Sequence, residues 1–391
     1  MNDSLGLSRQ NLVITPFFTM SNSNSVRLGV VGVGGMGGGH ARSLINGNIP
    51  RATLAAVCDA NPIHFEKFPN IPSFTDFEAM LDSGEIDAVI IATPHYFHTT
   101  QSIAALERGI PVLTEKPIAV HKADALKMIA AWEQHKPVFA AMFNQRTVPV
   151  YKKLRELLQD GTLGELRRVT WIATDWFRSE AYYASGGWRA TWGGEGGGIL
   201  VNQCPHNLDM FQWLFGMPTS VTALAKLGKY HNIEVEDEFH ALFDFENNAT
   251  GSIIASTGEG AGTNHLEIIT ENGRIVVEGD KLRWTKTEVP VTQYSRETKD
   301  TMKAPPKWEI TIPAHGKEGG HNEVIVNFVA AILDGAELIA PAQEGLKSVE
   351  IANAILYASS ERKTIDLPLD AEAYAAFLAD KIANSRFQFG K

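Results

Sequence analysis

The feature that most constrains this chain is an apolar run that ends in closely spaced glycines. Residues 28–33 have the composition of a buried parallel strand, and Gly32, Gly34 and Gly37 follow the spacing G-x-G-x-x-G. The first glycine permits a tight turn, the second lets the backbone approach a pyrophosphate, and the third lets the next helix pack closely. The pattern therefore predicts a dinucleotide-binding turn formed by Gly32, Val33, Gly34, Gly35, Met36 and Gly37.

A second predicted strand, at residues 53–58, favours this interpretation over the alternative of a flexible glycine-rich linker. The strand ends at Asp59, where a dinucleotide fold places an acid against the adenosine ribose. Ala60, Asn61 and Pro62 follow, so no Arg or Lys stands next to the carboxylate in the sequence to receive a 2′-phosphate. The sequence thus favours NAD over NADP as cofactor.

Length and composition limit the classes of protein that this chain can belong to. Its 391 residues are enough for two domains, and 44% hydrophobic with 20% charged residues is typical of a globular protein. The net charge of −10 argues against a nucleic-acid partner, and no apolar stretch is long enough to span a membrane. Two cysteines form no disulfide framework or zinc motif, which indicates a reducing, cytoplasmic location and no metal site.

Short apolar runs alternate with helical periodicity from residue 26 to about residue 142, which predicts a parallel sheet covered by helices. Ligands of such sheets lie beyond the carboxyl ends of the strands. Predicted strands at 88–92, 111–114 and 137–142 end near further polar residues. We therefore expect the cofactor-binding set to include Asp59, Thr93, Pro94, His98, Glu115, Lys116 and Asn144. For His98, capping or packing of the following helix is the alternative.

The pattern changes in the second half of the chain. A helix is predicted at 150–159, a strand at 166–176, a glycine-rich loop at 186–198 and a helix at 202–215. Six strand candidates between 220 and 287, joined by turns, predict an open antiparallel sheet, and helices are predicted at 322–333, 344–360 and 371–383. We expect a poorly ordered extension at 1–25, a dinucleotide-binding domain at 26–145, a second α/β domain at 146–365 and a helical tail at 366–391.

Four motifs in this order carry a resemblance to a known family. They are the glycine turn, Thr-Pro-x-x-x-His at 93–98, Glu-Lys-Pro at 115–117, and Asn202-x-x-x-His206-x-x-Asp209 after the glycine-rich loop. Together they resemble the glucose-fructose oxidoreductase / inositol dehydrogenase / MocA (Gfo/Idh/MocA) family over residues 26–365. The resemblance implies an α/β protein with a Rossmann domain and a second domain built on an open, mostly antiparallel sheet. It also implies a homodimer or homotetramer formed through that sheet and nicotinamide-dependent chemistry on carbohydrates.

Two residues are the strongest catalytic candidates. Lys116, at the carboxyl edge of the sheet, can donate to a substrate hydroxyl and polarise a forming carbonyl; a solvated surface lysine is the alternative. His206 suits the removal of a hydroxyl proton, since imidazole has a pKa near neutrality; a structural histidine is the alternative.

Asn202 is a departure from the family pattern, because relatives commonly have Asp at this position. An amide orients hydroxyls and the imidazole by hydrogen bonds, but it cannot share a proton as a carboxylate does. The spacing on a helix places Asp209 one turn after His206, so one hypothesis is that Asp209 supplies the missing carboxylate. An acid tied to its local backbone is the alternative.

Further substrate-binding candidates lie at the domain junction and before the glycine loop. Arg146 could bind an acidic or polyhydroxyl substrate, or else form a structural pair between domains. Tyr182, Trp188 and Arg189 have the composition of a sugar-stacking platform, for which core packing is the alternative. With Lys116, Asn202 and His206 they complete the predicted substrate-binding set.

Three functions are compatible with these residues. The first is a NAD-dependent oxidoreductase acting on a secondary hydroxyl or ketone of a sugar, glycoside or polyol. The second is an oxidoreductive glycosidase that oxidises a sugar ring transiently and cleaves a glycosidic bond without net use of NAD. The third is a non-catalytic regulator that binds dinucleotide, although regulators of this family tend to have lost the lysine or the histidine.

Overall fold

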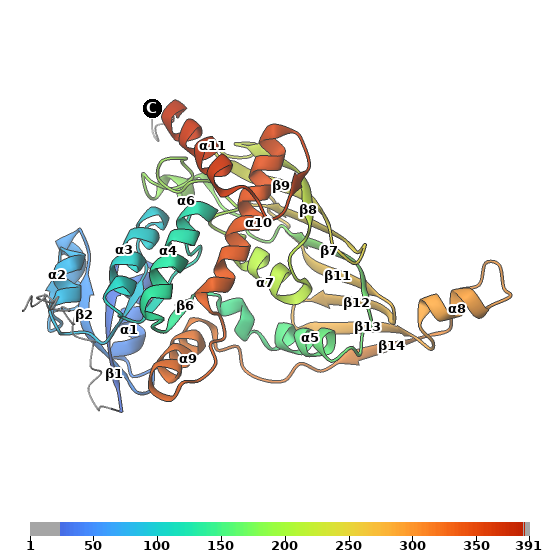
Figure 1. Ribbon diagram of the computed structural model, residues 1–391, viewed down its shortest axis with the longest axis horizontal. Coiled ribbons are helices and arrows are strands. Elements are labelled where there is room, and N and C mark those ends of the chain that lie inside the picture. The colour runs from blue at the N-terminus through green and yellow to red at the C-terminus, as the bar shows by residue number, and fades with distance from the viewer. Residues whose placement is uncertain (1–23, 386, 388–391) are drawn as a thin grey trace, which may run out of the picture.

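The computed structural model describes residues 24–385 and 387, so almost all of the predicted extension at 1–25 lies outside the described residues. The described chain contains two β-sheets that lie side by side, with helices packed around and between them (Figure 1). Among the described residues, every helix is too short or too polar to cross a membrane.

The first sheet has six parallel strands in the order β3-β2-β1-β4-β5-β6. Its strands are β1 (Val26–Val31), β2 (Ala52–Cys58), β3 (Ser73–Phe74), β4 (Ala88–Ile91), β5 (Val112–Thr114) and β6 (Phe139–Ala141). Its helices are α1 (Met36–Ile45), η1 (Pro62–Lys67), α2 (Phe77–Asp82), α3 (His95–Glu107), α4 (Lys122–His135) and η2 (Asn144–Thr147). All four residues of β4 are buried, as expected for a central parallel strand that is covered on both faces.

The second sheet has nine strands in the order β14-β13-β12-β11-β7-β10-β9-β8-β15. They are β7 (Leu166–Ala173), β8 (Ser220–Leu227), β9 (Glu236–Asp244), β10 (Thr250–Ser256), β11 (Asn264–Thr270), β12 (Gly273–Glu278), β13 (Lys281–Thr287), β14 (Lys307–Ile312) and β15 (Ile365–Asp366). The pairing is antiparallel except between β7 and β10, which run parallel. The predicted open, mostly antiparallel sheet is confirmed.

The helices of the second half lie between the two sheets and around the nine-stranded sheet, and the helix at 291–297 projects beyond the strands (Figure 1). They are α5 (Pro149–Gln159), α6 (Glu180–Ala184), α7 (Pro205–Phe215), α8 (Val291–Glu297), α9 (Gly320–Asp334), α10 (Ala342–Glu361) and α11 (Ala371–Asn384). Val324, Ile325 and Phe328 of α9 are buried in the same core as Leu28 of β1. Helix α9 therefore closes the Rossmann half, although it lies far along the chain, and it carries His321 to the edge of the parallel sheet.

Candidate functional site

A cavity of about 1140 Å³ lies at the carboxyl edge of the parallel sheet and extends to residues of the second half. It brings together most of the predicted site residues. Those that line it are Gly32, Gly34, Gly35, Met36, Asp59, Thr93, Pro94, His98, Glu115, Lys116, Tyr182, Trp188, Arg189, Asn202 and His206. Val33, Gly37, Asn144, Arg146 and Asp209 are not among its lining residues.

The glycine turn has the shape that a pyrophosphate requires. Gly32 has φ of +78°, and a Cβ there would stand 2.7 Å from the carbonyl oxygen of Ala92. A Cβ on Gly37 would stand 2.1 Å from the carbonyl oxygen of Gly32, so the helix packs against the turn too closely for a side chain. Gly35 has open space in front of it, and no side chain caps the N-terminus of α1. The first N-H groups of α1 therefore remain available for phosphate oxygens, so these residues fit a dinucleotide.

Asp59 follows β2 directly and lines the cavity, as predicted. Its carboxylate accepts a hydrogen bond from the backbone N-H of Asn61 (2.9 Å), and the Nδ1 atom of His64 lies 2.9 Å from its Oδ2 atom. His64 is a cavity residue that the sequence analysis missed, because it lies on the short helix η1, for which no signal was recognised.

Lys116 extends from the end of β5 toward the second half of the chain. Its Nζ atom donates to the backbone carbonyl of Asn202 at 2.6 Å, and burial lowers its pKa. The neighbouring Glu115 is held by His40, whose Nε2 atom lies 2.8 Å from the carboxylate. Burial alone would raise the pKa of Glu115, but the hydrogen bond and charge of His40 outweigh it and bring the pKa to about 2. Glu115 is thus already paired beside the lysine.

His206 lies in the first turn of α7, directly after Pro205 at the start of this helix. It lines the same cavity as Lys116, so the two strongest candidates converge as the motifs predict. Burial, and secondly the positive charge of Lys116, lower the pKa of His206 to about 3. Among the described residues no group hydrogen-bonds its Nδ1 atom. The ring is therefore neutral near pH 7, and because Nδ1 is itself buried, Nε2 is the ring nitrogen that a ligand can reach.

Asp209 does not assist His206, so that prediction was wrong. Its carboxylate accepts a pair of hydrogen bonds from Arg146, at 2.8 and 2.6 Å, and a third from Gln212. Arg146, 1% exposed, also donates to Glu344 (2.5 Å) and to the carbonyl of Ile339. The substrate-binding prediction for Arg146 was also wrong, because all its contacts are internal. The structural interdomain pair is the role that the geometry supports.

Asn202 precedes α7 instead of lying within it, because this helix begins at Pro205 and not at residue 202 as predicted. Its amide nitrogen donates to Glu195, a 2% exposed acid in the glycine-rich loop whose other oxygen accepts from the N-H of Ala190 (2.7 Å). Its amide oxygen accepts from Tyr182 (3.2 Å). Glu195, which the sequence analysis missed, is therefore the carboxylate beside Asn202.

The aromatic cluster before the glycine loop divides between the cavity and the core. Tyr182 and Trp188 line the cavity, whereas Tyr183 and Trp192 are 3% and 4% exposed within the core of the second half. The guanidinium of Arg189 stacks over the rings of Tyr182 (4.8 Å) and Trp188 (4.6 Å). Core packing is thus the role of two of these side chains, and three are available to a ligand.

Two predicted cofactor residues have local partners of their own. Both ring nitrogens of His98 lie 2.8 Å from backbone carbonyl oxygens, those of Pro117 and Thr93, so its contacts support the packing alternative. Asn144 begins the short helix η2, and its Oδ1 atom is buried without a hydrogen-bond partner among the described residues. Since Asn144 is also not among the cavity-lining residues, its predicted contact with the cofactor has no support.

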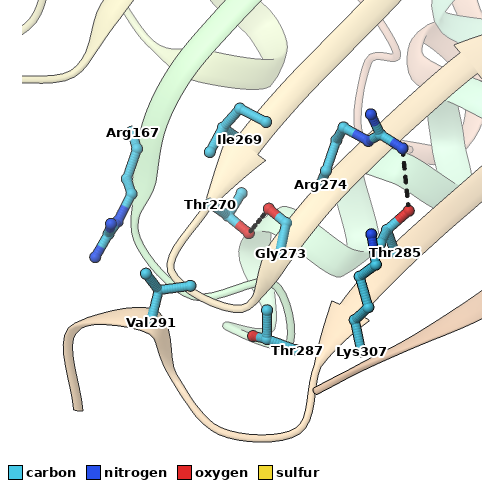
Figure 2. A pocket seen from close by; sticks show the side chains of 9 residues that line it. All are labelled: Arg167, Ile269, Thr270, Gly273, Arg274, Thr285, Thr287, Val291 and Lys307. Atoms are coloured by element: carbon cyan, nitrogen blue, oxygen red, sulfur yellow. Dashed lines mark hydrogen bonds between the residues drawn. The ribbon is translucent and has the colours of Figure 1, made fainter. Parts of the chain in front are cut away.

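A second, shallower hollow of about 280 Å³ lies on the nine-stranded sheet (Figure 2). Its cationic residues are Arg167, Arg274 and Lys307, and Figure 2 shows Arg167 across the hollow from the other two. Arg167 is already paired with Glu271. This hollow therefore has no convergent set of polar groups, unlike the cavity around Lys116.

Comparison with known proteins agrees with this geometry. The family description "Oxidoreductase family, NAD-binding Rossmann fold" matches residues 26–143, and "GFO/IDH/MocA C-terminal domain" matches residues 151–276, together more than half of the chain. The chain belongs to the Gfo/Idh/MocA family. The resemblance predicted from the four motifs, the fold class and the NAD-binding Rossmann domain are confirmed.

The relatives within this family include dehydrogenases of polyols. Inositol 2-dehydrogenase from Corynebacterium glutamicum is 30% identical over 199 residues, and the match spans 50% of this chain and only 55% of that protein. Inositol 2-dehydrogenase from Rhizobium meliloti is 26% identical, over 88% of this chain and 99% of that protein. The structure of the WlbA dehydrogenase from Bordetella pertussis in complex with NADH and UDP-GlcNAcA has a TM-score of 0.74 and 26% identity, covering 88% of this chain and all of that one.

Proposed function

We propose that this chain is a NAD-dependent oxidoreductase that interconverts a secondary hydroxyl and a ketone on a sugar, glycoside or polyol. The observation that carries the proposal is that Lys116 and His206, from different halves of the chain, line one cavity with the glycine turn. Polyol dehydrogenases among the relatives support the same class of substrate.

The proton chemistry follows from the two side chains. Bound NAD supplies the acceptor for the hydride. His206, which burial keeps neutral, takes the hydroxyl proton at Nε2, the ring nitrogen that is not buried. The ammonium of Lys116 donates to the substrate oxygen, and its lowered pKa makes it a stronger donor as negative charge develops there. Asn202 holds the lysine through its carbonyl oxygen.

We propose NAD over NADP as the cofactor. Asp59 lines the cavity at the end of β2, where its carboxylate suits the hydroxyls of a ribose and repels a 2′-phosphate. Comparison of the dissociation constants for NADH and NADPH tests this preference; tighter binding of NADPH would contradict it.

The catalytic proposal is tested by a panel of sugars, glycosides and polyols assayed for NADH formation, with Lys116→Ala as the variant. We expect a loss of roughly 10²- to 10³-fold in kcat, as for removal of a donor to a developing oxyanion, with the NADH dissociation constant nearly unchanged. Lys281→Ala, at an exposed position, is the matched control.

Unchanged turnover in Lys116→Ala would refute the role of the lysine. Release of free aglycone without accumulation of NADH would refute net oxidation and identify an oxidoreductive glycosidase.

We propose a cytoplasmic homodimer or homotetramer joined through the nine-stranded sheet. Both cysteines, Cys58 and Cys204, are buried and free, which suits a reducing compartment. Leu224 and Leu242, on neighbouring strands β8 and β9, are 61% and 63% exposed, which is unusual for apolar side chains on a sheet. A monomer mass by light scattering would contradict the assembly.

The net charge of −10 makes us expect no nucleic-acid or anionic membrane partner.

A further inference from the structure

Three positively charged side chains gather at the end of the cavity that holds Lys116. Lys116 and Arg189 line the cavity, and Arg178 stacks over the ring of Tyr182 beside them, 5.0 Å from its centre. Within residues 24–385 and 387, none of these three cations lies within 4.0 Å of a carboxylate oxygen, although the chain as a whole is acidic. Clustered cations without carboxylate partners indicate an anionic ligand.

Two acids, Glu115 and Glu195, lie near these cations. Glu115 is paired with His40. Glu195 is buried, its carboxylate is bound by the N-H of Ala190 and the amide of Asn202, and burial raises its pKa. Neither acid forms a salt bridge with the cluster. The charges of both acids still act on Lys116, whereas Arg189 lines the cavity with a single hydrogen bond from its guanidinium.

Arg189 has the geometry to recognise a planar anion. Its guanidinium carbon lies 4.8 Å from the ring centre of Tyr182 and 4.6 Å from that of Trp188, and these two contacts restrict where the group can move. Among the described residues it makes one hydrogen bond, from Nη1 to the hydroxyl of Tyr182 at 3.0 Å. A guanidinium has five N-H donors, so most of them remain unused at the wall of the cavity.

Hydrogen bonds connect Arg189 to the reacting end of the cavity and not to the glycine turn. The Tyr182 hydroxyl donates to the amide oxygen of Asn202 at 3.2 Å, and the carbonyl oxygen of Asn202 accepts from Lys116 at 2.6 Å. A group held by Arg189 would thus belong to the molecule whose hydroxyl meets Lys116.

We infer that the substrate is a sugar acid, whose carboxylate is bound by Arg189 while its reacting hydroxyl lies between Lys116 and His206. The reaction at the hydroxyl rests on the proposed function, whereas the binding of the carboxylate by Arg189 does not. The planar guanidinium fork binds a carboxylate through two oxygens; it can bind a phosphate in the same way, so a phosphate ligand is included in the test to separate the two.

The test compares matched pairs of ligands that differ by the carboxylate: glucuronate with glucose, and galacturonate with galactose. Binding of each to the protein saturated with NADH is measured by calorimetry, and NADH formation from NAD is measured separately. We expect at least one uronate to bind about 10- to 100-fold more tightly than its neutral partner, as for a charge-assisted pair of hydrogen bonds. Glucose 6-phosphate provides the phosphate arm.

The variant Arg189→Met should remove this preference, so that a uronate and its neutral partner bind about equally. Arg189→Lys, which keeps the charge and loses the fork, should retain part of it. Arg274→Met, in the hollow of Figure 2, is the matched control and should retain all of it.

Four results would overturn the inference: equal binding of uronates and neutral sugars, tighter binding of the phosphate, an unchanged preference in Arg189→Met, or a 10-fold loss of NADH binding in that variant. Uronate binding that depends on Arg189 but gives no NADH with any sugar would instead refute the proposed reaction and support the ligand class. The two proposals therefore fail in distinguishable ways.

Discussion

Asp209 shares a motif with His206, and Arg146 is a predicted substrate-binding residue, yet neither side chain lines the cavity. The two side chains are 1% and 0% exposed, and Glu344 joins them from the start of α10. Arg146 belongs to η2, Asp209 to α7, and Glu344 to α10, so this ion cluster ties together three segments at the junction of the two sheets. Removing one member would leave an opposite charge buried without a partner.

We expect Arg146→Met to lower the free energy of unfolding by roughly 3–5 kcal/mol, because Asp209 would keep its buried charge. Arg146→Met combined with Asp209→Leu should recover much of that loss, since both charges are then removed. Urea unfolding curves of the two variants measure the difference. If Arg146→Met caused only a small loss of stability but a large rise in KM, the prediction would be contradicted and Arg146 would be a substrate-binding residue.

The residues of the cavity were predictable to the extent that local sequence specifies them. Lys116 and Asp59 were predicted as site residues because they stand at the ends of predicted strands. The glycine turn was predicted from the spacing of its glycines. The partners of Arg146 lie 63 and 198 residues away, so no local pattern reveals them. Glu195 stands as the one acid in a run of glycines, a signal that the sequence did contain, but its contact with Asn202 depends on the fold of the loop.

At the scale of elements, the turn between β1 and α1 offers a matched pair of substitutions on one helix. A Cβ on Gly37 would stand 2.1 Å from the carbonyl oxygen of Gly32, whereas a Cβ on Gly39 meets nothing within 4 Å. We expect Gly37→Ala to weaken NADH binding at least 10-fold, because the turn must open to relieve the contact. Gly39→Ala should bind NADH normally and gain up to about 1 kcal/mol of stability from helix propensity.

Fluorescence titration with NADH and thermal unfolding measure the two effects. If both variants bound NADH equally well, the close approach of helix and turn would have no part in cofactor binding.

Elements with strong periodicity were predicted from sequence, and those without it were not. The buried strands β1 and β4 and the amphipathic helix α5 lie where their patterns place them. Strand β14 was missed because it is an edge strand whose residues are exposed or half-buried, and α8 was missed because none of its residues is buried. The parallel pairing of β7 with β10 is set by packing between distant segments, which turn signals cannot specify.

For the molecule as a whole, a set of neutral buried histidines sets the response to acid. Burial lowers the pKa of His206 to about 3 and also lowers the pKa of His95, His98, His121 and His321. The unfolded chain protonates such groups near pH 6.5, so it binds more protons than the folded chain below that pH. Each such histidine therefore lowers the free energy of unfolding as the pH falls, by about 1.4 kcal/mol per pH unit until its own folded pKa is reached.

Glu236 works in the opposite direction, because burial raises its pKa to about 7. The folded chain takes up this proton below pH 7 and the unfolded chain only near pH 4.5, so Glu236 adds stability as the pH falls between these values.

We expect urea unfolding from pH 6.5 to 4.5 to show a net loss of stability. His206→Gln should make that loss shallower by about 1.4 kcal/mol per pH unit, and Glu236→Gln should make it steeper. Equal slopes in the wild-type protein and His206→Gln would mean that the folded cavity does not lower the pKa of this histidine.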